Sequence, residues 1–241
     1  MEILEGAYLA VNAILFMAAL AQSITGFGYS IVAMSLLPGV IALQTAVPLV
    51  TLIGIVGNII IWYYHRHDYS FKEVGKLTIA SFIATPLGVI LLDRLPEAVA
   101  LKGLGILIVS YVVYDWLNFT LPRFQSDIWA YLMGGMSGIL NGAYTVNGPP
   151  LIVYGNCRRW NPKEFKGNLT ALFFLSSGVA AIAHGWQGNI TLSVWKFVVY
   201  SLPVYGCGIW LGTVLSKSID PVVFRRITLA LLMVAGLRLL F

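Results

Sequence analysis

A broken stretch inside an otherwise apolar segment is the feature that most restricts how this chain can fold. Residues 141–150 read NGAYTVNGPP, and their Asn-Gly and Pro-Pro pairs favour turns and remove two consecutive backbone donors. Because apolar residues lie on both sides, the break exposes N–H and C=O groups at membrane depth. Such groups are tolerated there only where protein or a water-filled cavity satisfies them. The break therefore predicts a solute-binding site, and a plain kink between two helices is the alternative.

The composition predicts a protein that lies within a membrane. Of the 241 residues, 59% are hydrophobic and 10% are charged, whereas soluble proteins have about 25% charged residues. We expect an all-α polytopic membrane protein, a single integral domain over residues 1–241, surrounded by the lipid bilayer of the cell membrane. In such a protein the net charge of +5 belongs to cytoplasmic loops and indicates no nucleic-acid partner. Glu2 and Glu5 precede the first apolar segment, so we expect that segment to remain in the mature protein.

The order of apolar segments in residues 6–119 recurs in residues 127–241. Each half has a break, a short apolar piece and three spans, and Thr25 matches Thr145 at an offset of roughly 120 residues. Internal duplication in a transporter-like chain predicts a solute site between the two related halves. The alternative is that hydrophobic helical segments resemble one another by chance. The expected spans are 6–24, 41–64, 71–92 (bent or ended near Pro86), 98–119, 128–140, 167–184, 190–215 and 221–241, and the short pieces are 29–37 and 151–154.

The distribution of basic residues predicts how the two halves face. If each break is a hairpin, eleven of the 15 Lys and Arg residues lie on one side of the membrane; if each break crosses, nine do. The positive-inside rule favours the hairpins. We therefore expect two inverted repeats, each a broken or re-entrant hairpin plus three transmembrane helices, with both termini outside and the loop 158–166 cytoplasmic. The two breaks then enter from opposite faces and can meet near the midplane.

The breaks also predict what is bound. A helix begins after each break, near Ser30 and near Pro149, and a helix N-terminus carries about half a positive charge with free N–H groups. Glycines there allow close backbone approach, although helix packing is the alternative for each of them. Gln44 and Asn168 begin the spans next to the breaks, where interhelical hydrogen bonding is the alternative. The predicted substrate-binding residues are Thr25, Gly26, Gly28, Tyr29, Ser30, Gln44, Asn141, Gly142, Thr145, Asn147, Gly148, Pro149 and Asn168.

Missing motifs restrict the function as well. The chain has no zinc-protease motif, no P-loop and no intramembrane catalytic set, and Gly26-Phe27-Gly28 does not open a βαβ unit. We expect a protein that is not an enzyme, without cofactor or metal, whose partner is a small anionic solute. His184 and Asp115 can relay protons if they lie within spans, and an interfacial position is the alternative. A homodimer is compatible with the sequence.

At its two breaks the chain resembles the TauE/SafE family of sulfite and organosulfonate exporters, which includes 4-toluene sulfonate uptake permease-like proteins. The resemblance covers nearly the whole length and rests on 25–28 (TGFG) with Pro38, 138–142 (GILNG), 147–151 (NGPPL) and 166–168 (KGN). It implies secondary transport of a small sulfur-containing or carboxylated anion, usually outward. A passive anion channel, a membrane enzyme or an assembly subunit remain alternatives.

Overall fold

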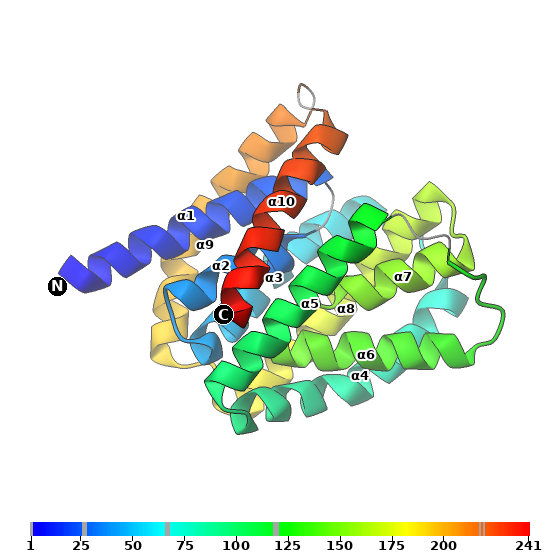
Figure 1. Cartoon of the computed structure of the whole chain (residues 1–241), viewed down its shortest axis with the longest axis horizontal. Helices are drawn as coiled ribbons and strands as arrows, with labels where there is room; N and C mark the ends of the chain where they lie inside the picture. Colours follow the sequence, from blue (N-terminus) through cyan, green and yellow to red (C-terminus); the bar gives the residue numbers. More distant parts are fainter. Residues whose placement is uncertain (1, 26–27, 66–67, 118–120, 217, 219) are drawn as a thin grey trace. The chain divides into compact units, whose positions relative to one another are not determined.

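The computed structural model describes residues 2–25, 28–65, 68–117, 121–216, 218 and 220–241. Over these residues the chain is helical and has no strand (Figure 1). Six of the helices, α1, α3, α4, α5, α8 and α9, are long and apolar enough to cross a membrane. The expectation of an all-α polytopic membrane protein is confirmed. The helices are α1 (Glu2–Thr25), α2 (Tyr29–Leu36), the 3-10 turn η1 (Leu37–Gly39), α3 (Leu43–His65), α4 (Phe71–Arg94), α5 (Glu97–Leu117), α6 (Ile128–Tyr144), α7 (Gly148–Arg158), α8 (Pro162–Trp186), α9 (Leu192–Leu215) and α10 (Pro221–Leu240).

The chain divides into two compact units. Unit 1 comprises residues 1–53, 95–118 and 190–241, and unit 2 comprises residues 54–94 and 119–189. Unit 1 therefore holds α1, α2, α5, α9, α10 and the first part of α3, while unit 2 holds α4, α6, α7, α8 and the rest of α3. Each unit takes helices from both halves of the sequence, so the units are not the two repeats.

In unit 2, glycines let α4 and α6 run side by side in parallel. Gly134, Gly138 and Gly142 occur at every fourth position of α6, which places them on one face of the helix. A Cβ atom at Gly138 would overlap the carbonyl oxygen of Ser81, and one at Gly142 would overlap that of Thr85. The two backbones therefore touch, as they do in transmembrane interfaces built from small residues.

In unit 1, glycines of α9 likewise let this helix pack closely against α1. A Cβ atom at Gly212 of α9 would lie 2.7 Å from the Cβ atom of Ser23. In unit 2, a Cβ atom at Gly88 would lie 3.0 Å from the backbone nitrogen of Ala143. In both helix pairs, therefore, a glycine of one helix lies close to a small residue of the other.

The second break differs in extent from the expectation. Helix α6 continues through Asn141 and Gly142 to Tyr144, and α7 begins at Gly148, so the break spans only residues 145–147. Pro149 and Pro150 lie in the first turn of α7, where a missing N–H costs no intrahelical hydrogen bond. The expected break at 141–150 was therefore too long, and the expected short piece at 151–154 was too short.

One other expected boundary was also wrong. Helix α8 begins at Pro162 and not at 167, because Asn161 caps it by accepting from the N–H groups of Lys163 and Glu164. Helix α4 continues through Pro86 to Arg94, close to the expected span 71–92. A proline removes one helical hydrogen bond, and the packed face of α4 against α6 outweighs that loss.

The glycine contact between α4 and α6 gives a stability prediction. Gly138→Ala and Gly142→Ala force the two backbones apart, and we expect each to cost about 1–3 kcal/mol, as overpacked interiors do. Gly135→Ala on the same helix is the matched control, because a Cβ there has no neighbour within 4 Å. Thermal unfolding of the detergent-solubilised protein measures the difference. Equal melting temperatures for all three variants would show that the backbones are not in contact.

Candidate functional site

The second break lies at the tip of a hairpin formed by α6 and α7, called here the second hairpin. The N–H of Phe124, shortly before α6, donates to the carbonyl of Cys157 over 3.1 Å, and Arg158 Nη1 donates to the carbonyl of Phe124 over 3.1 Å. The end of α7 therefore lies beside the segment that leads into α6, as the ribbon in Figure 1 shows. The chain therefore enters and leaves the second hairpin at the same end.

The tip of the second hairpin begins with a strained residue. Thr145 has a φ of 56°, in the left-handed region. Its N–H donates to the carbonyl of Asn141 over 2.8 Å and the N–H of Val146 donates to that of Leu140 over 3.3 Å, which ends α6. For a β-branched residue this conformation is a rare outlier that costs about 1–2 kcal/mol. Such outliers cluster at functional sites.

Two of the predicted binding residues meet at one serine of α8. Asn147 Nδ2 donates to Ser176 Oγ over 2.9 Å, and Asn141 Nδ2 donates to the Ser176 carbonyl over 2.9 Å. Ser137 Oγ of α6 donates to the Asn147 carbonyl over 3.0 Å, and all these groups are buried. The amides thus join three helices, and each amide nitrogen carries a second N–H besides the one used in these bonds. Sequence reasoning missed Ser176, because a lone serine in an apolar helix carries no signal until its partners are known.

The N-terminus of α7 is poorer in donors than expected. Gly148 begins the helix, but Pro149 and Pro150, next in its first turn, have no N–H. The first turn of α2, by contrast, consists of Tyr29, Ser30 and Ile31, whose N–H groups have no intrahelical partner. Of the two helix ends, therefore, only α2 supplies a full set of N–H groups.

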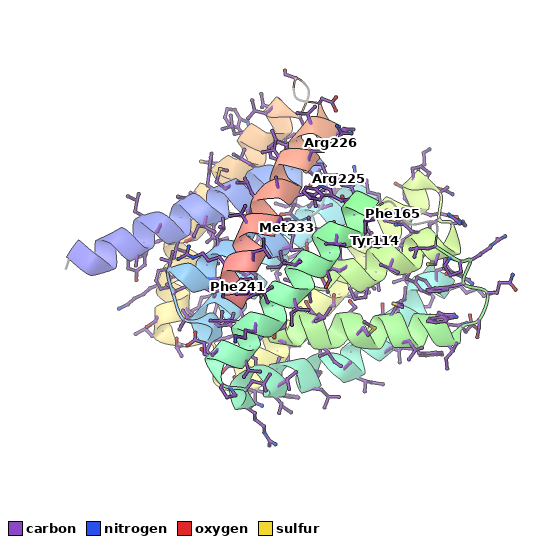
Figure 2. The ribbon with its side chains drawn as sticks, viewed as in Figure 1. Tyr114, Phe165, Arg225, Arg226, Met233 and Phe241 are labelled. Atoms are coloured by element: carbon purple, nitrogen blue, oxygen red, sulfur yellow. The ribbon has the colours of Figure 1, made fainter. Side chains whose placement is uncertain are left out.

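The first break, in unit 1, lies beside a cation. Thr25 ends α1, and Gly28 precedes α2 with a φ of 97°, a conformation that favours glycine. Both line a small cavity of about 20 Å³ together with Tyr111 of α5 and Arg225 of α10. Figure 2 labels Arg225 near the start of α10, and its guanidinium forms an ion pair with Asp115. Sequence reasoning counted Arg225 only as a cytoplasmic charge. Gly26 lies outside the described residues.

Tyr29 and Ser30 follow the first break, while Gln44 lies elsewhere. Tyr29 is buried with its ring edge-on to Tyr205 at a centroid distance of 5.1 Å, and Ser30 is half-buried. Gln44 follows Leu43, whose N–H donates to the carboxylate of Glu97 over 2.9 Å. Glu97 begins α5, roughly 20 Å along that helix from the residues that line the cavity at the first break. The structure therefore does not bring Gln44 to the break.

Asn168 also lies away from the tip of the second hairpin. Its Oδ1 accepts from the N–H of Ser70 over 2.7 Å, just before α4. Asn168 and Ser176 are about 12 Å apart along α8. The described structure thus gathers Asn141, Gly142, Thr145, Asn147, Gly148 and Pro149 at one break and Thr25, Gly28, Tyr29 and Ser30 at the other, and it leaves Gln44 and Asn168 outside both.

Comparisons with known proteins identify the family of this chain. The sulfite exporter TauE/SafE family matches residues 11–239, nearly the whole chain. A "Probable sulfite/organosulfonate exporter TauE" from Cupriavidus necator is 24% identical over 226 residues, which cover 91% of this chain and 88% of the relative. No solved structure matches the chain. The chain therefore belongs to the TauE/SafE family, and it is a membrane transporter and not an enzyme.

Proposed function

We propose that this transporter exports a small sulfur-containing or organic anion, such as sulfite or an organosulfonate, by alternating exposure of a site built on its two helix breaks. The observation that carries the proposal is the second break, where strained Thr145 and the amides of Asn141 and Asn147 lie buried within apolar helices. Polar non-helical backbone at such a depth is typical of transporter binding sites. The relative from Cupriavidus necator, a probable sulfite/organosulfonate exporter, supports the substrate class.

The two breaks have complementary roles in this proposal. The first break supplies positive potential, from the N–H groups at the start of α2 and from Arg225. The second break supplies neutral amide donors, which orient an oxyanion without adding a full charge. Hydrogen bonds to a charged group contribute about 1.5–3 kcal/mol each, net of the water contacts that they replace, so a few of them favour binding of a small anion.

The inverted orientation of the repeats is part of the proposal. In unit 2, Lys76 pairs with Asp127 at the end that we assign to the cytoplasm, and Asn189 donates to Asp93 over 3.0 Å at the other end. Each contact joins two segments that the charge distribution assigns to the same side. The same agreement holds in unit 1 for Asp115 with Arg225 and for Glu97 with Leu43. These contacts support hairpins that enter from opposite faces.

A passive anion channel is the alternative within the same family. The cavity at the first break holds about 20 Å³, roughly the space of one water molecule. A cavity this small favours a carrier, which must move to admit its substrate, over an open pore.

The transport proposal predicts losses that are specific to the breaks. In proteoliposomes loaded with labelled sulfite, sulfoacetate or taurine, we expect Asn147→Ala and Gly28→Leu to lower transport by about tenfold or more, because each removes a binding donor or distorts the break. Ser126→Ala is the control, since Ser126 also forms a side-chain hydrogen bond, with the Ile128 N–H, at an exposed position about 25 Å along α6 from the break. Wild-type rates in both break variants would rule out this site.

The orientation proposal predicts labelling from opposite sides. In a background with both native cysteines replaced by serine, we expect Gln125→Cys to react with an impermeant maleimide only from the cytoplasm and Gln187→Cys only from outside. Both positions are exposed, and a single crossing by α8 separates them if α6 and α7 form a hairpin. Reaction of both from one side would show that the second hairpin crosses the membrane. Right-side-out and inside-out vesicles provide the comparison.

A further inference from the structure

A cavity of about 340 Å³ lies in unit 2 at the base of the second hairpin, far from its tip. Its wall includes Ser70, Glu73, Arg123, Arg158, Glu164 and Asn168. The volume is within the range of small-molecule binding sites. We call this space the basal cavity. In the orientation proposed above it opens at the cytoplasmic end of the unit.

Asn168 contributes a buried donor without an acceptor. Its side chain is fully buried, and its Oδ1 accepts from the N–H of Ser70 over 2.7 Å. Because a backbone N–H bonds to the amide oxygen, this contact fixes which end of the amide is nitrogen. Nδ2 then has no hydrogen-bond partner within the described residues. An unsatisfied buried donor costs about 1–3 kcal/mol, and an oxyanion in the basal cavity would remove that cost.

The two carboxylates of the basal cavity, Glu73 and Glu164, already accept hydrogen bonds from other groups of unit 2. Glu73 accepts from Arg158 Nε over 3.1 Å and from Arg158 Nη2 over 2.5 Å. Glu164 Oε2 accepts from the N–H of Asn161 over 3.2 Å as part of the cap of α8. The charge of Glu73 is therefore balanced by Arg158, whereas Glu164 keeps its negative charge, which Arg123 of the same wall offsets.

The cationic groups retain donors. Arg158 uses three N–H groups, two on Glu73 and one on the Phe124 carbonyl, which leaves further N–H groups on its Nη atoms. Arg123 is exposed, and no salt bridge to it is found among the described residues. The wall thus offers unused donors from Asn168, Arg123 and Arg158, and donors are what an oxyanion requires.

A second cavity, next to the basal cavity, adds further basic side chains. A neighbouring cavity of about 140 Å³ shares Glu73 and Arg158 with the basal cavity and adds Lys72, Lys76 and Asp127. The hydrogen bond from Lys76 holds the pKa of the Asp127 carboxyl below its ordinary value, so this carboxyl stays ionised and paired at neutral pH. Lys72 then leaves an excess of positive charge beside the basal cavity.

We propose that the basal cavity is an entry site, which binds a small oxyanion such as sulfite or a sulfonate on the cytoplasmic side before the anion reaches the breaks. Asn168 and Arg123 provide its main donors, and Arg158 adds an N–H while its pair with Glu73 keeps α7 against α4. The assignment rests on the proposed export of such anions. It also gives Asn168 a binding role that is separate from the tip of the second hairpin.

Calorimetric titration of the detergent-solubilised protein with sulfite tests the site directly. Asn168→Asp keeps the shape of the side chain and the acceptor for Ser70 but replaces the donor with a negative oxygen, so we expect the Kd to rise at least about tenfold. Arg123→Gln, at an exposed position, should raise it about threefold to tenfold without affecting folding. Arg159→Gln is the matched control, because Arg159 is adjacent to Arg158 and lines neither cavity.

The outcomes separate the entry site from transport itself. Wild-type affinity in both Asn168→Asp and Arg123→Gln, or no saturable sulfite binding by the wild type, would overturn the entry site. In proteoliposomes, the entry site predicts that Arg123→Gln raises the KM for anion supplied from the cytoplasmic side and leaves kcat and the opposite side unchanged. If Arg123→Gln raised the KM equally on both sides of the membrane, the entry site would also be overturned. Transport absent from the wild type, with calorimetric binding intact, would instead reject export and leave the cavity as a binding site.

Discussion

The contact between the backbones of α4 and α6 is the constraint on which the second hairpin depends. Gly134, Gly138 and Gly142 remove every side chain from one face of α6, and Gly88 removes one from α4. In a bilayer the hydrophobic effect does not drive helices together, so close van der Waals contact must do so. With α6 held along α4, the left-handed Thr145 and the short α7 have a rigid base. The hydrogen bonds to Ser176 then fix the polar tip against α8.

The polar groups of unit 2 fall into two sets with different surroundings. At the tip, amide and hydroxyl groups satisfy one another across three helices, so the hydrogen bonds are neutral and buried. At the base, charged side chains form ion pairs where the chain is more exposed, and the buried Asn168 amide there keeps a donor without a partner among the described residues. The order suits the passage of an anion, which would exchange charge-assisted contacts for neutral ones as it moves inward.

Much of the fold followed from the sequence because membrane helices are recognised by length, apolar content and breaks. The spans were found within a few residues, and the hairpin geometry of the second break followed from the positions of Lys and Arg. The boundaries that failed depend on local chemistry: Pro149 and Pro150 begin a helix instead of breaking one, and Asn161 starts α8 earlier than its apolar part.

The site was harder to predict, because proximity in sequence is a poor guide to proximity between helices. Gln44 and Asn168 start helices near the breaks in the chain, yet contacts to Glu97 and Ser70 place them elsewhere. Ser176 and Arg225 come near the breaks only through packing of helices distant in sequence, which no pattern along the chain records.

The exchange of helices between the two sequence halves has a consequence for biosynthesis. Tyr205 of α9 donates to Gln22 of α1 across 183 residues, so α1 leaves the ribosome long before the helix that covers its small-residue face. During translation this face must be shielded by lipid, by the insertion machinery or by a temporary neighbour. Unit 1 can close only after about the last fifth of the polypeptide has been inserted, whereas unit 2, complete at residue 189, can assemble while synthesis continues.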